Sequence, residues 1–317
     1  MAATTVRYAV VTGANKGIGF GICKQLVSDG ITVVLTARDE KRGVDAVEKL
    51  KEFGVPDKVV FHQLDVTDPK SIESFANFIK TQFGKLDILV NNAGINGATV
   101  DRDALAAAGE KIDSVDWRKF THETYESAEA TIRTNYYGVK LMCEALIPLL
   151  ELSDSPRIVN VSSIMGQLER IPNEWARGVL SDVDSLAEEK VDEVLKQFLE
   201  SFKEGSIETK GWPRTLSSYI LSKAALTAYT RVLAKKYPSF CINAVCPGFV
   251  KTDLNYNTGY FSVDEGAERV VRLALLPNGG PSGLFFSRGE FDVETIKKLF
   301  GLNALTLRGK FMRGELV

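Results

Sequence analysis

The chain has 317 residues, of which 44% are hydrophobic and 25% charged, ordinary values for a globular protein with a substantial core. Its formal net charge of -2 gives no electrostatic basis for binding nucleic acid or an anionic membrane surface. Two histidines are too few for a histidine-rich metal site, so we expect no metal, and the four cysteines, none in a C-x-x-C pair, are expected to be buried thiols.

The N-terminal residues lead directly into a predicted strand. The stretch MAATTVRYAVVTG lacks the apolar core and the cleavage site of a signal peptide, and no apolar run reaches membrane-spanning length. We therefore expect a cytoplasmic protein with no membrane partner.

Short β-rich runs alternate with amphipathic helical patterns along the chain. The predicted strands are Tyr8–Thr12, Thr32–Ala37, Val59–Leu64, Ile88–Asn91, Arg157–Ser162, Cys241–Cys246 and Gly283–Phe286. The predicted helices between them include Ile18–Ser28, Lys41–Phe53, Ser71–Phe83 and Tyr136–Leu150. Strands that are almost wholly apolar are typical of a parallel sheet covered on both faces. The pattern predicts a Rossmann-type, doubly wound α/β fold of about seven strands, in one domain over residues 1–317.

Two segments interrupt this alternation. Residues 96–122 are polar and irregular. Residues 167–213 carry an acidic helical pattern whose apolar positions recur at helical spacing, at Val191, Val194, Leu195, Phe198 and Phe202. We expect the second segment to be a helical insert rather than a linker.

A glycine-rich turn follows the first predicted strand and opens the first predicted helix. It reads TGANKGIG, and its candidate cofactor residues are Gly13, Asn15, Lys16, Gly17, Ile18 and Gly19. Glycines in this context let the backbone approach a pyrophosphate, and the helix N-terminus favours the negative charge. The turn therefore predicts a dinucleotide site.

Charged residues at the end of the second strand bear on which dinucleotide is used. Asp39 lies where a carboxylate would bind the ribose 2′-hydroxyl of NAD. Arg38, Arg42 and Lys16 are three cations that would converge where a 2′-phosphate sits. The alternative is that both arginines are solvated residues at a helix start. The balance of charge favours NADP(H).

Tyr219 and Lys223 are spaced i, i+4 in a long predicted helix, which places them on one face. An ammonium beside a phenol stabilises the phenolate and prepares it for proton transfer near neutral pH. The pair alone is also compatible with an ordinary amphipathic helix. Three other features support a catalytic role for the pair: Asn135, the Ser162–Ser163 pair and the N-N-A-G run at 91–94. All of them follow or flank strand ends, where ligands of open α/β sheets bind.

The order of these motifs resembles the short-chain dehydrogenase/reductase family over residues 6–288. The motifs are T-G-x-x-x-G-x-G, N-N-A-G, the helix asparagine, the serine pair, Y-x-x-x-K and Pro247-Gly248. Longer stretches such as KLDILVNNAG and LIPLLELSDSPRIVNVSS resemble a plant branch that includes salutaridine reductase and menthone (neomenthol) reductases. Mammalian carbonyl reductase is a more distant relative.

The resemblance implies a role for each matching catalytic position. Tyr219 would be the general acid towards the carbonyl oxygen, and Ser163 would hydrogen-bond the same oxygen, with Ser162 as its competitor for that role. Lys223 would bind the nicotinamide ribose and lower the tyrosine pKa, and Asn135 would support a proton relay to it. Tyr219 and Lys223 would also contact the cofactor. Further implied cofactor contacts are Asp65, Val66, Asn92, Ala93, Gly94, Pro247, Gly248, Val250 and Thr252.

The segment between Ser163 and Tyr219 is long for the family. In similar members it lies over the surface that others use for subunit contacts, which implies a monomer. Specificity is expected in residues 96–122, 164–175 and 212–218. Candidate substrate residues are Ser163, Ile164, Met165, Trp175, Trp212, Leu216 and Tyr219, and the alternative for the apolar ones is that they only pack the insert.

The implied activity is NADPH-dependent reduction of a ketone to a secondary alcohol. A terpenoid or alkaloid-type ketone, menthone-like or salutaridine-like, is the leading substrate class. The alternatives are a broad carbonyl reductase for xenobiotic or reactive carbonyls and a non-catalytic NADP(H)-binding sensor. Relatives that reduce an enone C=C bond have the tyrosine changed, so Tyr219 favours carbonyl chemistry.

The C-terminal segment 289–317 departs from the plant relatives. It carries an amphipathic pattern at 293–302 and a basic stretch at 308–313. We expect this tail to be flexible or loosely packed.

Overall fold

The computed structural model describes residues 6–53, 56–101 and 119–287. Predictions for the tail 289–317 and for most of the stretch 96–122 therefore lie outside the described residues. The chain groups into two compact units: the first comprises Met1–Ala93, Gly138–Ile164 and Thr230–Val317, and the second comprises Gly94–Tyr137 and Met165–Tyr229. That the whole chain is one domain stays a prediction.

The first unit is built on a parallel sheet of seven strands in the order β3-β2-β1-β4-β7-β8-β9. The strands are β1 (Tyr8–Val11), β2 (Thr32–Ala37), β3 (Val59–Gln63), β4 (Ile88–Asn91), β7 (Arg157–Val161), β8 (Cys241–Val245) and β9 (Phe285–Phe286). Each matches a predicted strand to within two residues at either end, which confirms the predicted Rossmann-type sheet. The chain runs outward from β1 to β3 and then returns to place β4 beside β1. Ligands of open α/β sheets bind beyond the strand ends at such a reversal.

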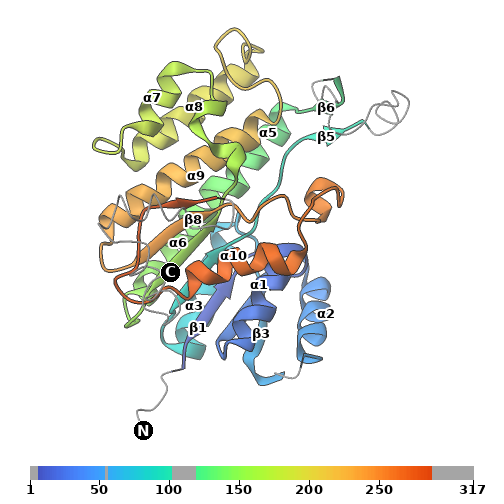
Figure 1. The fold of residues 1–317 in the computed structure, drawn as a ribbon, viewed down its shortest axis with the longest axis vertical. Coiled ribbons are helices and arrows are strands. Elements are labelled where there is room, and N and C mark those ends of the chain that lie inside the picture. The colour runs from blue at the N-terminus through green and yellow to red at the C-terminus, as the bar shows by residue number, and fades with distance from the viewer. Residues whose placement is uncertain (1–5, 54–55, 102–118, 288–317) are drawn as a thin grey trace, which may run out of the picture. The chain divides into compact units, whose positions relative to one another are not determined.

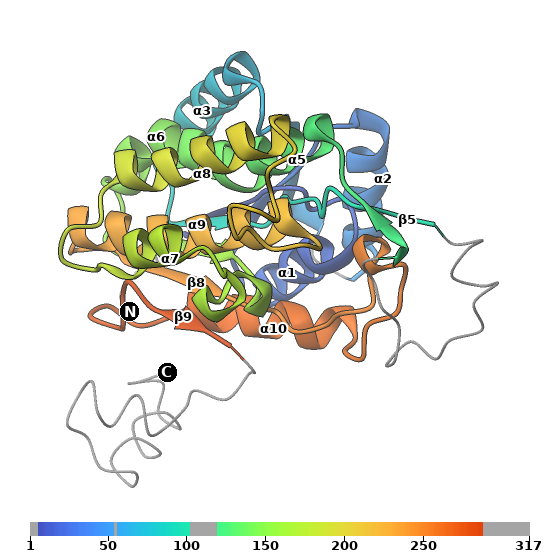
Figure 2. The same cartoon turned by 90° about the horizontal axis from the view of Figure 1, so that it is seen from above.

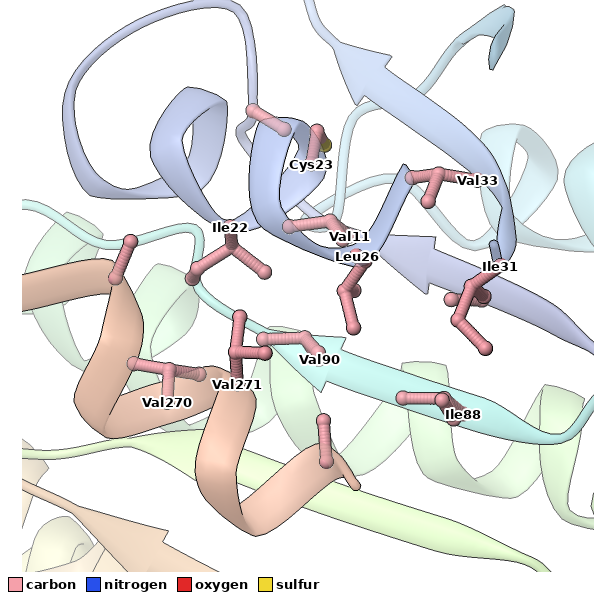
Figure 3. Packing of buried hydrophobic residues seen from close by; sticks show 14 of the residues in the cluster. Val11, Ile22, Cys23, Leu26, Ile31, Val33, Ile88, Val90, Val270 and Val271 are labelled. Atoms are coloured by element: carbon pink, nitrogen blue, oxygen red, sulfur yellow. The ribbon is translucent and has the colours of Figure 1, made fainter. Parts of the chain in front are cut away.

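Helices cover both faces of this sheet. They are α1 (Gly17–Ser28), α2 (Glu40–Lys51), α3 (Pro69–Phe83), α6 (Gly138–Leu150) and α10 (Val263–Ala274). The helices α1 and α10 lie side by side (Figure 1), and with α2 they share a core with alternate strand residues such as Val11 and Val90 (Figure 3). The helices α3 and α6 pack on each other and on β3 and β4. Because side chains alternate along a strand, the residues between those of the first core face the other way.

Short polar residues begin three of these helices. Asp39, Asp68 and Ser262 are N-caps whose side chains accept hydrogen bonds from backbone N–H groups in the first turn. Gly84 ends α3 in the left-handed conformation that glycine favours. The predicted helix starts at Ile18, Lys41 and Ser71 are each within two residues of the observed ones.

The second unit is mainly helical. It contains α5 (Tyr125–Ile132), the π-helical segment Arg133–Tyr137, α7 (Glu174–Ser181), α8 (Glu188–Lys203) and the first 13 residues of α9 (Ser217–Lys236), with a short antiparallel pair β5 (Thr99–Val100) and β6 (Thr121–His122). The helices α7 and α8 lie side by side (Figure 1), and α8 also packs on α5 (Figure 2).

The predicted insert at 167–213 is helical, as expected, but it holds two helices where the sequence pattern indicated one. Val191, Val194, Leu195 and Phe198 of α8 are fully buried, and Phe202 is partly buried. The extra helix α7 begins at the N-cap Asn173, whose side chain accepts a hydrogen bond from Ala176 N. The eight residues of α7 are too short a stretch for a clear periodic pattern.

The four cysteines are buried free thiols, as predicted, and burial raises the pKa of the Cys23 thiol. Among the residues that the structure describes, no helix has the length and hydropathy needed to cross a membrane.

Candidate functional site

The glycine-rich turn lies between β1 and α1 in the first unit. Gly13 and Gly17 have φ of +62° and +57°, which disfavour other residues. A Cβ on Gly13 would lie 2.9 Å from Ala93 Cα, and one on Gly19 would lie 2.5 Å from Asn92 Nδ2. The turn therefore requires glycine for both its conformation and its close packing.

The end of β4 supports this turn directly. Asn92 Nδ2 donates to Thr12 O at 2.8 Å and to Gly13 O at 3.1 Å. Thr12 Oγ1 accepts hydrogen bonds from Asn92 N and Ala93 N, both at 3.0 Å. Asn92 and Ala93, which were predicted to contact the cofactor, also hold the glycine turn in place.

The first turn of α1 has no side-chain cap, since Lys16 occupies the N-cap position without such a bond. Lys16 Nζ instead pairs with Asp253 Oδ2 at 2.7 Å, and this contact lowers the pKa of the Asp253 carboxyl. The sequence analysis missed Asp253, which is 237 positions away along the chain. Lys16 thus already has an anionic partner within its own unit.

Asp39, Arg38 and Arg42 stand at the start of α2. Asp39 is the N-cap of α2, and its Oδ1 accepts from Arg42 N at 2.8 Å. The side chains of Arg38 and Arg42 are exposed. The carboxylate that could have favoured NAD therefore has a structural task in the helix start, while both arginines remain accessible to solvent.

The loop after β8 contributes the predicted stretch 247–252. A Cβ on Gly17 would lie 3.4 Å from Thr252 Cγ2, so Thr252 is adjacent to the glycine turn. Gly248 has φ of +91° and sits against Arg269 and Phe261. Val250 is buried and forms a β-bridge with Phe261.

Two further predicted positions of the first unit follow β3. Asp65 Oδ1 accepts hydrogen bonds from Thr67 N at 2.9 Å and from Thr67 Oγ1 at 2.7 Å, which fixes the loop after the strand. Val66 is buried against Gly138, where α6 begins. Both residues therefore lie at the carboxyl end of the strand, as the sequence order implied.

The serine pair follows β7. Ser162 is buried, and its N–H donates to Val245 O at 2.8 Å. Ser163 and Ile164 are partly exposed. Of the pair, Ser163 is therefore the more accessible residue.

The second unit brings together Tyr219, Lys223, Asn135 and Gly94. Lys223 is only 5% exposed, and its Nζ lies 5.7 Å from the centre of the Tyr219 ring. A Cβ on Gly94 would lie 3.2 Å from Asn135 Oδ1 and 3.5 Å from Lys223 Nζ. Tyr219 itself is partly exposed. The predicted acid, its cationic neighbour and the helix asparagine thus share one small region.

Asn135 is fully buried in the π-helical segment, a distortion often found at functional sites. Its Oδ1 accepts from Ile95 N at 2.9 Å, and its Nδ2 donates to Ile95 O at 2.8 Å and to Ser222 Oγ at 3.0 Å. Ser222 Oγ in turn donates to Tyr219 O at 2.8 Å. The sequence analysis missed Ser222, although its place directly before Lys223 was visible.

The apolar substrate candidates fall into different surroundings. Trp212 is 3% exposed with its ring 5.5 Å from that of Phe198, so it belongs to the packing of the second unit. Trp175 lines an open groove of about 610 Å³ along α7 and α8, and none of the predicted catalytic residues lines that groove. Met165 and Leu216 are partly exposed, and Leu216 has φ of +51° directly before α9.

Comparison with known proteins finds a matching family and similar chains. The family described as short chain dehydrogenase matches residues 7–174. The (+)-neomenthol dehydrogenase of Arabidopsis thaliana is 62% identical over 291 residues, which cover 91% of this chain and 98% of that protein.

Two solved structures of plant reductases are similar over most of their length. The structure of salutaridine reductase from Papaver somniferum has a TM-score of 0.84 at 54% identity, covering 88% of this chain and 99% of that one. Menthone neomenthol reductase from Mentha piperita has a TM-score of 0.79 at 53% identity, covering 90% of this chain and 100% of that one.

Proposed function

The chain belongs to the short-chain dehydrogenase/reductase family of oxidoreductases, and from that premise we propose that it is an NADPH-dependent reductase of a terpenoid or alkaloid-type ketone. Tyr219 is the proposed proton donor. The observation that carries the proposal is the buried Lys223 beside the Tyr219 ring, on the same helix and next to Asn135. The names of the similar plant proteins, a neomenthol dehydrogenase and a salutaridine reductase among them, support the ketone class.

The glycine turn of the first unit fits a nicotinamide dinucleotide. Gly13 and Gly17 give the turn its positive-φ backbone, and the uncapped first turn of α1 offers N–H groups to a phosphate. Gly13, Asn15, Lys16, Gly17, Ile18 and Gly19 would hold the pyrophosphate side, and Asp65, Val66, Asn92, Ala93, Gly94, Pro247, Gly248, Val250 and Thr252 would line the rest. NADPH supplies a hydride when bound there.

The preference for NADPH over NADH is proposed on the charges at the start of α2. Arg38 and Arg42 are exposed cations, and Asp39 is engaged as the cap of α2. Guanidinium groups bind phosphate through charge-assisted hydrogen bonds. Lys16 contributes less to this preference because Asp253 already neutralises it.

The chain's own groups can deliver a proton to a carbonyl oxygen. A phenol donates more readily when a nearby ammonium stabilises the phenolate that remains. Lys223 is the proposed ammonium, and its burial strengthens that interaction because water screens it less. Ser163 is the proposed second donor to the same oxygen, since it is the more accessible residue of the pair. Ile164, Met165 and Leu216 remain proposed apolar substrate contacts, whereas Trp175 lies in a groove of its own.

Replacement of Tyr219 by phenylalanine tests the proposal. Removal of a general acid costs about 10²- to 10⁴-fold in rate, so Tyr219→Phe should lose at least about 100-fold in kcat while NADPH binding is kept. The readout is NADPH consumption with a panel of terpenoid, alkaloid and small aromatic ketones, followed by chiral analysis of the alcohols. Tyr125→Phe, which removes a hydroxyl that contacts Glu129 on α5, is the matched control.

Three outcomes separate the alternatives. Turnover restricted to terpenoid or alkaloid ketones supports the proposal, and comparable turnover across the panel indicates a broad carbonyl reductase. NADPH binding with no turnover of any ketone by the unaltered protein indicates a sensor. Unchanged turnover by Tyr219→Phe would refute the assigned proton donor.

We also propose a cytoplasmic monomer. The apolar face of α8 is already buried within the second unit, so it offers little surface to another subunit. Four buried free cysteines are in keeping with a reducing compartment. Sedimentation at micromolar concentration should give a single species of one chain, and a dimer or tetramer would contradict this.

A further inference from the structure

The start of the catalytic helix α9 is unusual for a helix of its length. Leu216 stands at the N-cap position, because its carbonyl accepts the first helical bond, from Ile220 N at 2.8 Å. A leucine side chain has no oxygen with which to cap a helix. Leu216 also has φ of +51°, a conformation that a residue with a Cβ rarely adopts. The residues at this helix start therefore need a partner from elsewhere.

Glu123 supplies that partner. Its Oε2 accepts hydrogen bonds from Ser217 N at 2.7 Å and from Ser217 Oγ at 2.9 Å. Its Oε1 accepts from Ser218 N at 3.1 Å and also from Ser218 Oγ. Both serines are buried, so their N–H groups would lack water if the carboxylate were lost. One carboxylate thus satisfies four donors in the first turn of α9.

The segment that carries Glu123 is itself fixed on both sides. It follows β6, where His122 pairs with Thr99 of β5. It precedes Thr124, whose side chain caps α5 in a reciprocal capping box with Ser127. Charge also favours the arrangement, since a carboxylate at a helix N-terminus meets the positive end of the helix dipole.

Tyr219 is the next residue after the two serines and is held from its other side as well. Its carbonyl accepts from Ser222 Oγ at 2.8 Å, and Ser222 Oγ accepts from Asn135 Nδ2. The first turn of α9 is therefore held by the hydrogen bonds of Glu123 before Tyr219 and by those of the Asn135–Ser222 pair after it. The main-chain position of Tyr219 depends on both attachments.

We propose that Glu123 is a positioning residue for Tyr219, an inference that rests on the proposed role of Tyr219 as proton donor. Loss of the carboxylate frees the first turn of α9 and displaces the phenol from its productive position. Displacement of a reacting group by about 1 Å can cost 100-fold in rate. The glycine turn belongs to the other unit and keeps its own hydrogen bonds, so NADPH affinity should fall little, by no more than the contacts expected from Tyr219 and Lys223.

The test compares Glu123→Ala with Ser201→Ala at a temperature well below both melting temperatures. Ser201→Ala removes a buried hydroxyl that donates to Gln197 O in α8, so it lowers the stability of the same unit without changing a bond at the start of α9. Rates are expressed per NADPH-binding molecule. We expect Glu123→Ala to lose about 10- to 100-fold in kcat, with little change in the NADPH dissociation constant, and Ser201→Ala to stay within about twofold of the unaltered protein.

A solvent deuterium isotope effect on kcat separates positioning from mere stability. Proton transfer is masked wherever product release limits turnover, so a misplaced phenol should raise the isotope effect. A purely structural role changes the fraction of folded protein and leaves the isotope effect as it was. Equal kcat and equal isotope effects for the two variants would overturn the proposal.

Two further variants keep the outcome decisive. If Glu123→Ala does not fold, Glu123→Gln retains one acceptor oxygen and should show an intermediate loss in kcat with a raised isotope effect. A Glu123→Gln variant identical to Ser201→Ala in both would overturn the proposal. Tyr219→Phe is measured alongside. If it keeps turnover, the proposed function fails first; if it is inactive while Glu123→Ala matches the unaltered protein, only the role of Glu123 fails.

Discussion

The glycine turn of the first unit and the start of α9 in the second are both helix beginnings, but they are built in opposite ways. The turn before α1 depends on residues without side chains and on backbone atoms held by Asn92. The start of α9 depends on side chains brought from a distance, chiefly Glu123 and the Asn135–Ser222 pair. The first leaves its N–H groups uncapped beside the turn, whereas the second has N–H groups already satisfied.

The difference matches the role proposed for each of the two helix starts. A helix start that accepts a phosphate must leave its N–H groups available for the ligand. A helix that presents a proton donor must instead hold one side chain in one position, and closed hydrogen-bond networks provide that rigidity. We therefore expect substitutions in the two regions to separate cofactor affinity from kcat.

The largest effect is expected for Gly13→Ala in the turn. The new Cβ would meet Ala93 Cα at 2.9 Å, at a φ of +62° that already disfavours alanine. Because backbone cannot yield as a flexible side chain does, NADPH affinity should fall by more than about 100-fold, measured by the change in NADPH fluorescence on binding. Gly84→Ala is the matched control: φ is +72° there, but no atom lies within 4 Å of the new Cβ. It should cost about 1 to 2 kcal/mol of stability and leave NADPH binding intact.

A smaller effect is expected for Arg38→Asp at the start of α2. Loss of a charge-assisted hydrogen bond to a phosphate costs about 1.5 to 3 kcal/mol, which corresponds to a rise of about 10- to 100-fold in the KM for NADPH. The KM for NADH should change far less. Lys41→Asp makes the same change of charge on the same exposed helix start and serves as the control. Equal effects on the two cofactors would remove the charge argument for NADPH.

The smallest effect is expected for Ser222→Ala beside Tyr219. It removes the bonds that Ser222 makes with Asn135 Nδ2 and Tyr219 O. An unsatisfied buried donor costs about 1 to 3 kcal/mol, which should appear as a lower melting temperature. We expect kcat to fall by about 2- to 10-fold with NADPH affinity unchanged, since the two bonds of Ser222 are lost while those of Glu123 remain. Ser201→Ala, which removes a buried hydroxyl bonded to Gln197 O in α8, should lower stability without changing kcat. If NADPH affinity fell instead of kcat, the expected separation between the glycine turn and the start of α9 would be contradicted.

Most of the first unit could be predicted because its signals are local. Each strand is a short apolar run, and the glycine turn stands directly between a strand and a helix, so a few adjacent residues carry the information. In the insert, the pattern of α8 was clear over 16 residues, whereas the eight residues of α7 gave too few turns to reveal a period. The family of the chain followed from the order of its motifs, and the matching family and relatives confirm it.

The proposed catalytic residues could be singled out from the sequence, but not the residues that hold them in place. Tyr219 and Lys223 are four positions apart, so their shared helix face follows from helix geometry alone. Trp212 illustrates the opposite case, since an aromatic residue beside an expected pocket turned out to be packed against Phe198. Burial of an apolar side chain depends on its neighbours in space, which composition does not reveal.

The sequence by itself determined the strand–turn–helix cofactor motif, the parallel sheet and the tyrosine–lysine pair. Backbone geometry fixes each of them within a few residues. Only the tertiary structure decided that Asp253 neutralises Lys16 across 237 positions and that Glu123 caps α9 across 94. Such contacts join residues that are brought together by the packing of whole elements. The local sequence around a carboxylate does not indicate which distant N–H groups it will bind. Tertiary packing therefore supplied what the local pattern lacked: the partners that hold the start of the helix carrying Tyr219.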